Sequence, residues 1–183
     1  MKRSYFTEYC GRGPYGQIYR DHSGVANCIA NLRRQRAQVG SLLVLGAATG
    51  EVLRDFERAL GVRAHGCEVS RWAHARIPTR FRGRIRRADL RRHVPELVRA
   101  GERFDAVFTS ALVYLAAADV APVLRDCAAL ARFFHFYAST SDDFEPNDRH
   151  RTLLRPRRWW RERFLAAGWT PTRSPYLWAR AGG

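Results

Sequence analysis

One stretch of the chain, residues 41–70, constrains the fold more than any other part. It contains a short run of Leu and Val, a turn of small residues, an amphipathic segment and a second short apolar run that ends in an acidic residue. Residues 42–45 are apolar at every position, which is typical of a parallel strand covered by helices on both faces. Residues 51–60 carry apolar side chains at helical spacing. This order predicts a strand, a turn, a helix and a second strand.

The turn between the first strand and the helix consists of the small residues Gly46, Ala47, Ala48, Thr49 and Gly50. Small side chains let a ligand approach the backbone, and a helix N-terminus offers N–H groups to a negative charge. Glu68 lies 18 residues after Gly50, where the second strand of a doubly wound sheet presents an acid to ribose hydroxyls. The stretch therefore predicts a nucleoside cofactor site, with a purely structural turn as the alternative.

Strand and helix patterns alternate along the rest of the chain. Residues 104–110 and 132–138 predict a fourth and a fifth strand. Residues 169–172 and 176–180 flank a turn and predict a terminal hairpin. We expect an α/β fold with a single Rossmann-like, doubly wound, mostly parallel seven-stranded sheet that ends in a C-terminal antiparallel hairpin.

The length of 183 residues fits one domain with a full core. We expect residues 1–40 to form an N-terminal arm and helix on the lid or substrate side, and residues 41–183 to form the cofactor-binding core. The arm mixes tyrosines with glycines, so it either closes over the ligands or packs on the sheet edge. Its candidate substrate-binding residues are Tyr9, Arg12 and Tyr15.

The net charge of +15 indicates a polyanionic partner such as nucleic acid or a membrane surface. However, Lys2 is the only lysine among 32 basic residues. Such a bias is typical of a GC-rich coding background, which explains the choice of arginine but not the excess over acidic residues. Nucleic acid is therefore a less favoured partner than a small molecule or a glycan.

The four cysteines are scattered, without a CxxC pair or a histidine at ligand spacing. This pattern argues against a zinc site and a disulfide framework, and free thiols favour the cytoplasm. The first residues lack the apolar segment of a signal peptide. Asp119 and Pro122 interrupt the longest apolar stretch, so we expect no membrane span.

Further candidate ligand contacts follow a third strand, which we expect within residues 80–87, and the fourth strand. Asp89 stands where an acid can accept a hydrogen bond from the exocyclic amine of a purine, although it also fits a turn or a helix N-cap. Residues 95–100 predict a short helix. Ser110 and Tyr114 follow the fourth strand and are expected to face the reaction centre, because strand carboxyl ends hold ligands in α/β sheets.

A polar loop at residues 139–150 follows the fifth strand. Its carboxylates, hydroxyls and histidine can take up a proton or bind hydroxyl groups, so Asp142, Asp143 and His150 are the candidate general bases. An ordinary polar surface loop is the alternative. His135, in the middle of the fifth strand, is more typical of a core histidine than of a base.

Together these motifs resemble those of the class I S-adenosylmethionine-dependent methyltransferases. LLVLGAATG is similar to their first motif, usually VLDxGxGxG; GCEVS resembles their second-strand motif, and FDAVFTSALVYL their fourth-strand motif. The resemblance covers nearly the whole chain. EYCGRGPY, STSDDFEP and RPRRWWRERFLAAGW also resemble a bacterial branch often associated with sugar and cell-surface polysaccharide pathways.

The resemblance implies S-adenosyl-L-methionine as the cofactor. It places the methionine part on the backbone of Gly46, Ala48 and Gly50, the ribose on Glu68 and the adenine on Asp89. The remaining cofactor-binding positions are Ala47, Val69, Leu90 and Ser110.

Several positions depart from the family pattern. Val44 stands where the first motif usually carries an acid, and Ala48 where it usually has its middle glycine. Many relatives have an ExxEH stretch after the fourth strand, whereas Ser110, Val113 and Tyr114 occupy it here. Because the carboxylates that could hold a divalent metal are missing there, we expect a metal-independent enzyme.

We therefore expect a methyltransferase that acts on a hydroxyl of a small molecule, sugar or glycan by in-line displacement. One alternative is an RNA methyltransferase that uses the basic surface. Another is a catalytically inactive cofactor-binding scaffold, which Val44 and Ala48 allow.

Overall fold

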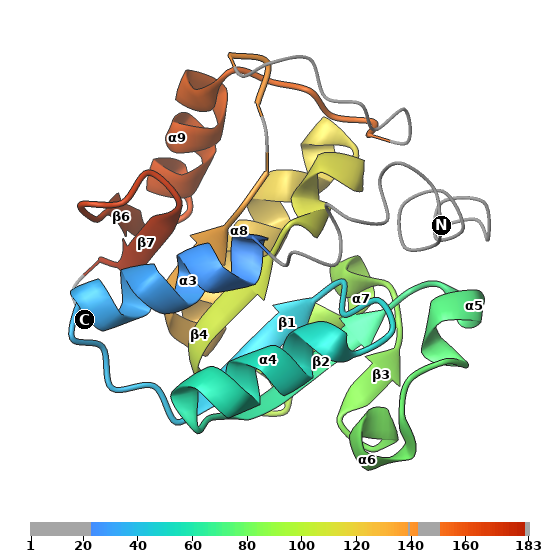
Figure 1. Cartoon of the computed structure of the whole chain (residues 1–183). Helices are drawn as coiled ribbons and strands as arrows, with labels where there is room; N and C mark the ends of the chain where they lie inside the picture. Colours follow the sequence, from blue (N-terminus) through green and yellow to red (C-terminus); the bar gives the residue numbers. More distant parts are fainter. Residues whose placement is uncertain (1–22, 139, 143–150, 182–183) are drawn as a thin grey trace.

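A computed structural model describes residues 23–138, 140–142 and 151–181 (Figure 1). Its strands are β1 (Ser41–Leu45), β2 (Arg63–Glu68), β3 (Ile85–Arg87), β4 (Phe104–Thr109), β5 (Ala131–Phe136), β6 (Trp169–Pro171) and β7 (Leu177–Arg180). They form one sheet in the order β3-β2-β1-β4-β5-β7-β6. The first five strands are parallel, whereas β7 is antiparallel to β5 and to β6. The predicted doubly wound sheet with a C-terminal hairpin is confirmed.

Helices cover both faces of this sheet. They are α3 (Ser23–Arg34), α4 (Glu51–Leu60), α7 (Leu90–Arg99), α8 (Ala117–Leu130) and α9 (Arg157–Ala166), with the short helices α5 (Arg71–His74), α6 (Thr79–Arg82) and η1 (Ala111–Tyr114). In Figure 1, α3 and α4 lie in front of the sheet, and α7, α8 and α9 belong to the layer that packs on its other face.

The first strand shows why its sequence is apolar throughout. Leu42 and Val44 pack in the core layer under α3 and α4, whereas Leu43 and Leu45 pack in the layer under α7 and α8. None of the four is more than 1% exposed. A strand that is covered on both faces has no polar face, so its sequence does not alternate between polar and apolar residues.

The helix α7 is longer than the sequence predicts, because it begins at Leu90 and not at Pro95. The carboxylate of Asp89 accepts a hydrogen bond from the N–H of Arg91 (2.9 Å) and caps the helix. Proline is favoured in the first turn of a helix, but here Pro95 lies inside α7. The N-cap residue therefore marks the start of this helix better than the proline does.

Candidate active site

The site lies where the strand order changes direction. β1 is flanked by β2 on one side and by β4 on the other, and Leu45, the last residue of β1, is in register with Cys67 and Thr109. In open α/β sheets, ligands bind beyond the carboxyl ends of the strands at such a point. The turn after β1, the end of β2 and the end of β4 therefore share one edge of the sheet.

The turn after β1 has a backbone that small residues permit. Gly46, Ala48 and Gly50 have positive φ angles of 85°, 49° and 88°, a region that glycine adopts easily. The N–H groups of Gly46 and Ala47 donate to the carbonyl of Cys67 on β2 (3.0 and 2.9 Å). Ala48 adopts the left-handed conformation at a cost of roughly 1 kcal/mol.

Glu68, at the end of β2, connects this turn to the second strand. It is only 4% exposed, and its two carboxylate oxygens accept hydrogen bonds from the N–H groups of Ala48 (2.9 Å) and Ser70 (2.7 Å). Burial raises the pKa of this carboxyl, and the two N–H groups partly oppose that rise. A carboxylate can accept about four hydrogen bonds, so both oxygens retain capacity for a ligand hydroxyl.

Two features beside Glu68 complete this part of the site. Gly50, the N-cap residue of α4, makes no side-chain capping bond, so the first N–H groups of the helix have no side-chain cap. The neighbouring Val69 is 47% exposed. The turn that Glu68 contacts therefore leads into a helix N-terminus, and an accessible apolar side chain follows Glu68 in the chain.

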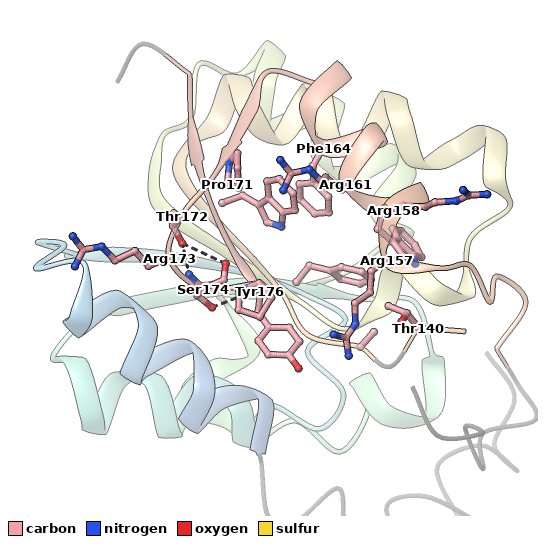
Figure 2. Close-up of a pocket in the computed structure, with 15 residues that line it drawn as sticks. Thr140, Arg157, Arg158, Arg161, Phe164, Pro171, Thr172, Arg173, Ser174 and Tyr176 are labelled. Atoms are coloured by element: carbon pink, nitrogen blue, oxygen red, sulfur yellow. Dashed lines mark hydrogen bonds between the residues drawn. The ribbon is translucent and has the colours of Figure 1, made fainter. Parts of the chain in front are cut away.

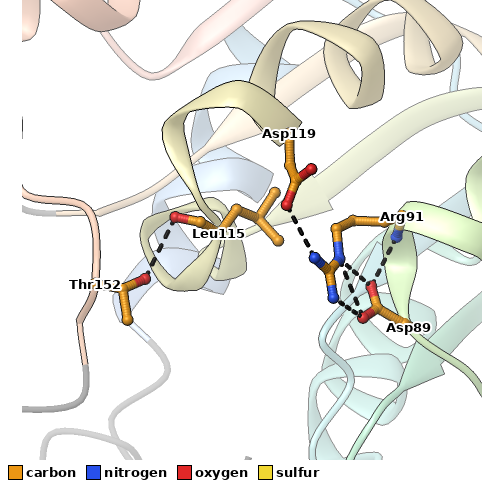
Figure 3. Close-up of polar contacts among 5 residues, drawn as sticks. All are labelled: Asp89, Arg91, Leu115, Asp119 and Thr152. Atoms are coloured by element: carbon orange, nitrogen blue, oxygen red, sulfur yellow. Dashed lines mark hydrogen bonds and ion pairs between the residues drawn. The ribbon is translucent and has the colours of Figure 1, made fainter.

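Asp89 follows β3 and is part of an ion-pair network. Its two oxygens contact the guanidinium group of Arg91 at 2.6 to 3.1 Å. The same guanidinium reaches Asp119 in the first turn of α8 (2.9 Å; Figure 3). The hydrogen bonds from Arg91 are the largest cause of the lowered pKa of Asp89. The structure assigns Asp89 to the helix cap, and its contact with adenine stays a prediction.

The end of β4 lies against the turn after β1. Thr109 is fully buried, donates its hydroxyl to the carbonyl of Leu45 (2.8 Å) and accepts from the N–H of Ala111 (2.8 Å), so its side chain serves the fold. A Cβ on Gly46 would lie 3.0 Å from the Cβ of Ala111. The exposed Ser110, the residue before Ala111, therefore lies near the turn, and its contact with the cofactor stays a prediction.

The candidate residues of the acceptor side are only partly described. Those outside the described residues are Tyr9, Arg12, Tyr15, Asp143 and His150. Tyr114 is half-buried at the end of η1, and Leu153 donates its N–H to the carbonyl of the adjacent Val113 (2.9 Å). Figure 3 shows a second contact between the same two segments, in which the hydroxyl of Thr152 donates a hydrogen bond to the carbonyl of Leu115 (3.3 Å). The segment that follows the polar loop is thus held at the end of η1.

Asp142 has a structural role in the described part of the loop. It is exposed, and its carboxylate accepts a hydrogen bond from the N–H of Arg157, the first residue of α9 (2.6 Å). A negative charge at a helix N-terminus is stabilised by the helix dipole. Its role as a general base stays a prediction.

A cavity of about 520 Å³ opens beside the end of β5 (Figure 2). Its walls come from the end of β5, from α9 and from the turn between β6 and β7. Because β7 runs antiparallel to β5, this turn lies at the same edge of the sheet as the carboxyl ends of the parallel strands. The sequence contains the arginines of α9 but does not bring them together with the distant turn, so the cavity was not predicted.

Other kinds of site find no support in the described part of the chain. No three His, Cys, Asp or Glu side chains within it form a cluster that could hold a metal ion. Cys28, Cys67 and Cys127 are free and buried, and burial raises the pKa of each thiol. No helix in the same residue ranges is long and apolar enough to cross a membrane.

Comparison with known proteins identifies the fold. No protein-family model and no curated protein sequence matches the chain, but solved structures do. The sugar N-methyltransferase KedS8 from Streptoalloteichus sp ATCC 53650 matches with a TM-score of 0.68 and 18% identity, over 91% of this chain and 92% of that protein. The chain has the class I methyltransferase fold.

Two further methyltransferases match equally broadly. The amino pentose methyltransferase CalS10 from Micromonospora echinaspora, solved with S-adenosylmethionine (SAM), gives a TM-score of 0.66 and 18% identity over 91% of this chain and 96% of that protein. Magnesium protoporphyrin IX methyltransferase from Synechocystis PCC 6803, also solved with bound SAM, gives a TM-score of 0.67 and 14% identity over 97% of this chain and 90% of that protein. Since this methyltransferase fold carries such different acceptors, the acceptor must be inferred from the site.

Proposed function

We propose that the protein transfers a methyl group from SAM to a small-molecule acceptor, with a sugar as the favoured class. The observation that carries the proposal is the turn from Gly46 to Gly50, which is hydrogen-bonded to the buried Glu68 at the switch point of a methyltransferase fold. Sugars are favoured because KedS8 is a sugar N-methyltransferase and CalS10 an amino pentose methyltransferase.

The residues at the switch point fit the proposed cofactor. Glu68 offers both oxygens to ribose hydroxyls, and the uncapped N-terminus of α4 offers N–H groups to the methionine carboxylate. Val69 would contact the adenine face, and Asp89 its amine. Val44 is fully buried, so no carboxylate stands at this position for the amino group. We therefore expect the affinity for SAM to depend on the backbone of the turn, on Glu68 and on Asp89.

SAM supplies, when bound, a methyl group activated by a positively charged sulfur. The protein then has to align the acceptor and, for a hydroxyl acceptor, take up its proton. We propose O-methylation, with Asp142, Asp143 and His150 as candidate bases. An amine acceptor is the competing choice, because KedS8 is an N-methyltransferase.

Titration calorimetry with SAM tests the cofactor. We expect saturable binding below millimolar concentration. If no binding is detected at millimolar SAM, methyl transfer to a small molecule and methyl transfer to RNA are both excluded.

A panel of hydroxyl and amino sugars, examined for a mass gain of one methyl group, tests the acceptor. Methylation restricted to amino sugars would replace O- by N-methylation. Cofactor binding without methylation of any acceptor would favour the inactive scaffold. If His150→Ala and Asp142→Ala each leave turnover intact, the proposed base is wrong.

RNA is a second candidate acceptor, favoured by one surface. Arg86 and Arg87 are exposed on the edge strand β3, and Arg80 and Arg82 are exposed on the adjacent α6. Several cations on one edge can track a phosphate backbone. RNA affinity that falls steeply with salt and depends on these arginines would support this candidate; salt-independent or absent binding would exclude it.

A further inference from the structure

The cavity beside β5 has an aromatic floor. Phe136, Trp160, Phe164 and Trp178 line it, and none is more than 7% exposed. The rings of Phe164 and Trp178 are stacked with centroids 4.5 Å apart, and those of Phe136 and Trp160 are 4.6 Å apart. These contacts hold the rings in place, so the floor is a preformed apolar surface.

The rim of the cavity is cationic. Arg157, Arg158 and Arg161 from α9 and Arg173 from the turn between β6 and β7 line it, and none of the described lining residues is acidic. In Figure 2, Arg161 projects from α9 toward Pro171 and Arg157 projects past Thr140 toward Tyr176, whereas Arg158 and Arg173 point outward. Arg157 and Arg161 are four residues apart, which places them on one face of the helix.

Among the described residues, no acidic side chain forms an ion pair with Arg161. Its guanidinium group makes no hydrogen bond or ion pair with the residues that the structure describes. Arg163, two residues further along α9, differs: it pairs with Glu162 (3.6 Å) and lies over the ring of Trp159. An arginine beside an apolar floor is suited to bind a phosphate or a carboxylate, because its planar group donates two parallel hydrogen bonds.

The location of the cavity connects it with the proposed reaction. β5 lies next to β4, whose end approaches the turn after β1. The N–H of Phe136 donates to the carbonyl of Tyr176 (2.9 Å), which holds the turn between β6 and β7 at the carboxyl edge of the sheet. A volume of about 520 Å³ lies in the range of small-molecule sites.

We propose that this cavity binds the methyl acceptor, and that the acceptor places an apolar face, such as the C–H face of a sugar ring, on the aromatic floor and presents an anionic phosphate or carboxylate to Arg157 or Arg161. The proposal rests on the proposed methyltransferase function. The apolar face lies on the aromatic floor, and the anion contacts a guanidinium group at the rim.

A pair of fluorescent probes separates the two parts of this recognition. 1-Anilinonaphthalene-8-sulfonate has an aromatic body with an anionic group, and N-phenyl-1-naphthylamine is its neutral counterpart. We expect the sulfonate to bind more tightly to the wild-type protein. The double variant Arg157→Gln/Arg161→Gln should weaken sulfonate binding about tenfold or more and leave the neutral probe unchanged. Both side-chain changes keep the backbone N–H that Asp142 accepts.

Arg163→Gln is the matched control, because it removes the same charge per residue from the same helix without altering the cavity lining. Sulfonate affinity should stay within about twofold of the wild-type value in this variant. Equal losses in the control and in the double variant, or no loss in the double variant, would overturn the proposal. Competition by phenyl phosphate and by benzoate then identifies the preferred anion, and displacement by neither also overturns it.

Calorimetry with SAM distinguishes failure of this inference from failure of the proposed function. The double variant should bind SAM as tightly as the wild-type protein does, since its substitutions lie outside the switch point. If the wild-type protein binds no SAM although the probes behave as expected, the cavity is an anion site and the acceptor role is wrong. If SAM binds but the probes fail, the proposed function stands and this inference fails.

Discussion

At the residue scale, Glu68 combines two tasks in one buried carboxylate. It accepts hydrogen bonds from the N–H groups of Ala48 and Ser70, and in the proposed function it also binds the ribose. Glu68→Gln keeps the side-chain size but removes the charge, so affinity for SAM should fall about tenfold or more. Glu68→Ala should nearly abolish binding. Calorimetry measures both, with the exposed Glu162→Gln as control; a mild effect of Glu68→Ala counts against the ribose role.

His135 is a second residue whose burial has a measurable consequence. It is fully buried on β5, and its Nε2 lies 3.1 Å from Oδ1 of Asn27 and 3.3 Å from Nδ2 of Asn31. Its Nδ1 has no hydrogen-bond partner among the residues that the structure describes. Burial lowers the pKa of His135 from 6.5 to about 3. This supports the interpretation of His135 as a core residue.

The lowered pKa predicts a loss of stability in acid. As the pH falls from 6.5 toward 3, the unfolded chain takes up a proton at this position that the folded protein does not. The free energy of unfolding should therefore fall by about 1.4 kcal/mol per pH unit from His135 alone. Urea unfolding of the wild-type protein and of His135→Phe at pH 6.5 and 5 checks this. If the free energy of unfolding falls by the same amount between pH 6.5 and pH 5 in the two proteins, His135 is protonated in the folded state.

At the element scale, the contact between β1 and β2 depends on Gly66. A Cβ at this position would lie 2.7 Å from the carbonyl oxygen of Val44, so alanine would force the strands to shift. Gly66→Ala should lower the free energy of unfolding by about 1 to 3 kcal/mol. Gly83→Ala is the control, because a Cβ added there would meet no described residue within 4 Å apart from its chain neighbours, and φ is −72°. Chemical denaturation that shows equal stability for the two variants would contradict the close approach.

The start of α7 gives a second prediction at this scale. Asp89 caps the helix and forms an ion pair with Arg91, and Arg91 forms a second ion pair with Asp119. Asp89→Ala should lower the free energy of unfolding by about 1 kcal/mol, whereas Asp89→Asn should keep most of it, since Asn is an equally good N-cap. Thermal unfolding of the two variants measures the difference. If Asp89→Asn is as unstable as Asp89→Ala, the ion pair and not the cap stabilises α7.

At the scale of the whole molecule, the net charge of +15 acts on the folded protein. Like charges held close together oppose the compact state, and salt shortens the Debye length from about 30 Å at 0.01 M to about 10 Å at 0.1 M. The melting temperature should therefore rise when sodium chloride is increased over this range. A fall would show that ion pairs such as Arg91 with Asp119 outweigh the repulsion.

The sequence predicted the order of strands and helices and the turn of the proposed cofactor site. The four apolar residues of β1 and the spacing of Glu68 from Gly50 involve residues close together in the chain. Such features can be recognised without knowing how the chain folds. The predicted start of α7 at Pro95 is wrong, because the helix begins after the capping side chain of Asp89 and tolerates the proline inside it. The cap depends on a hydrogen bond to Arg91, which the sequence pattern alone does not display.

The sequence by itself therefore determined the doubly wound sheet and the small-residue turn at its carboxyl edge, because both follow from periodicity and from short-range motifs. Only the tertiary structure decided which distant residues meet at that edge. The link from Arg91 to Asp119 spans 28 residues, and the cavity joins α9 with the turn between β6 and β7 through the pairing of β5 with β7. Such contacts depend on strand order in the sheet, which chain order does not specify.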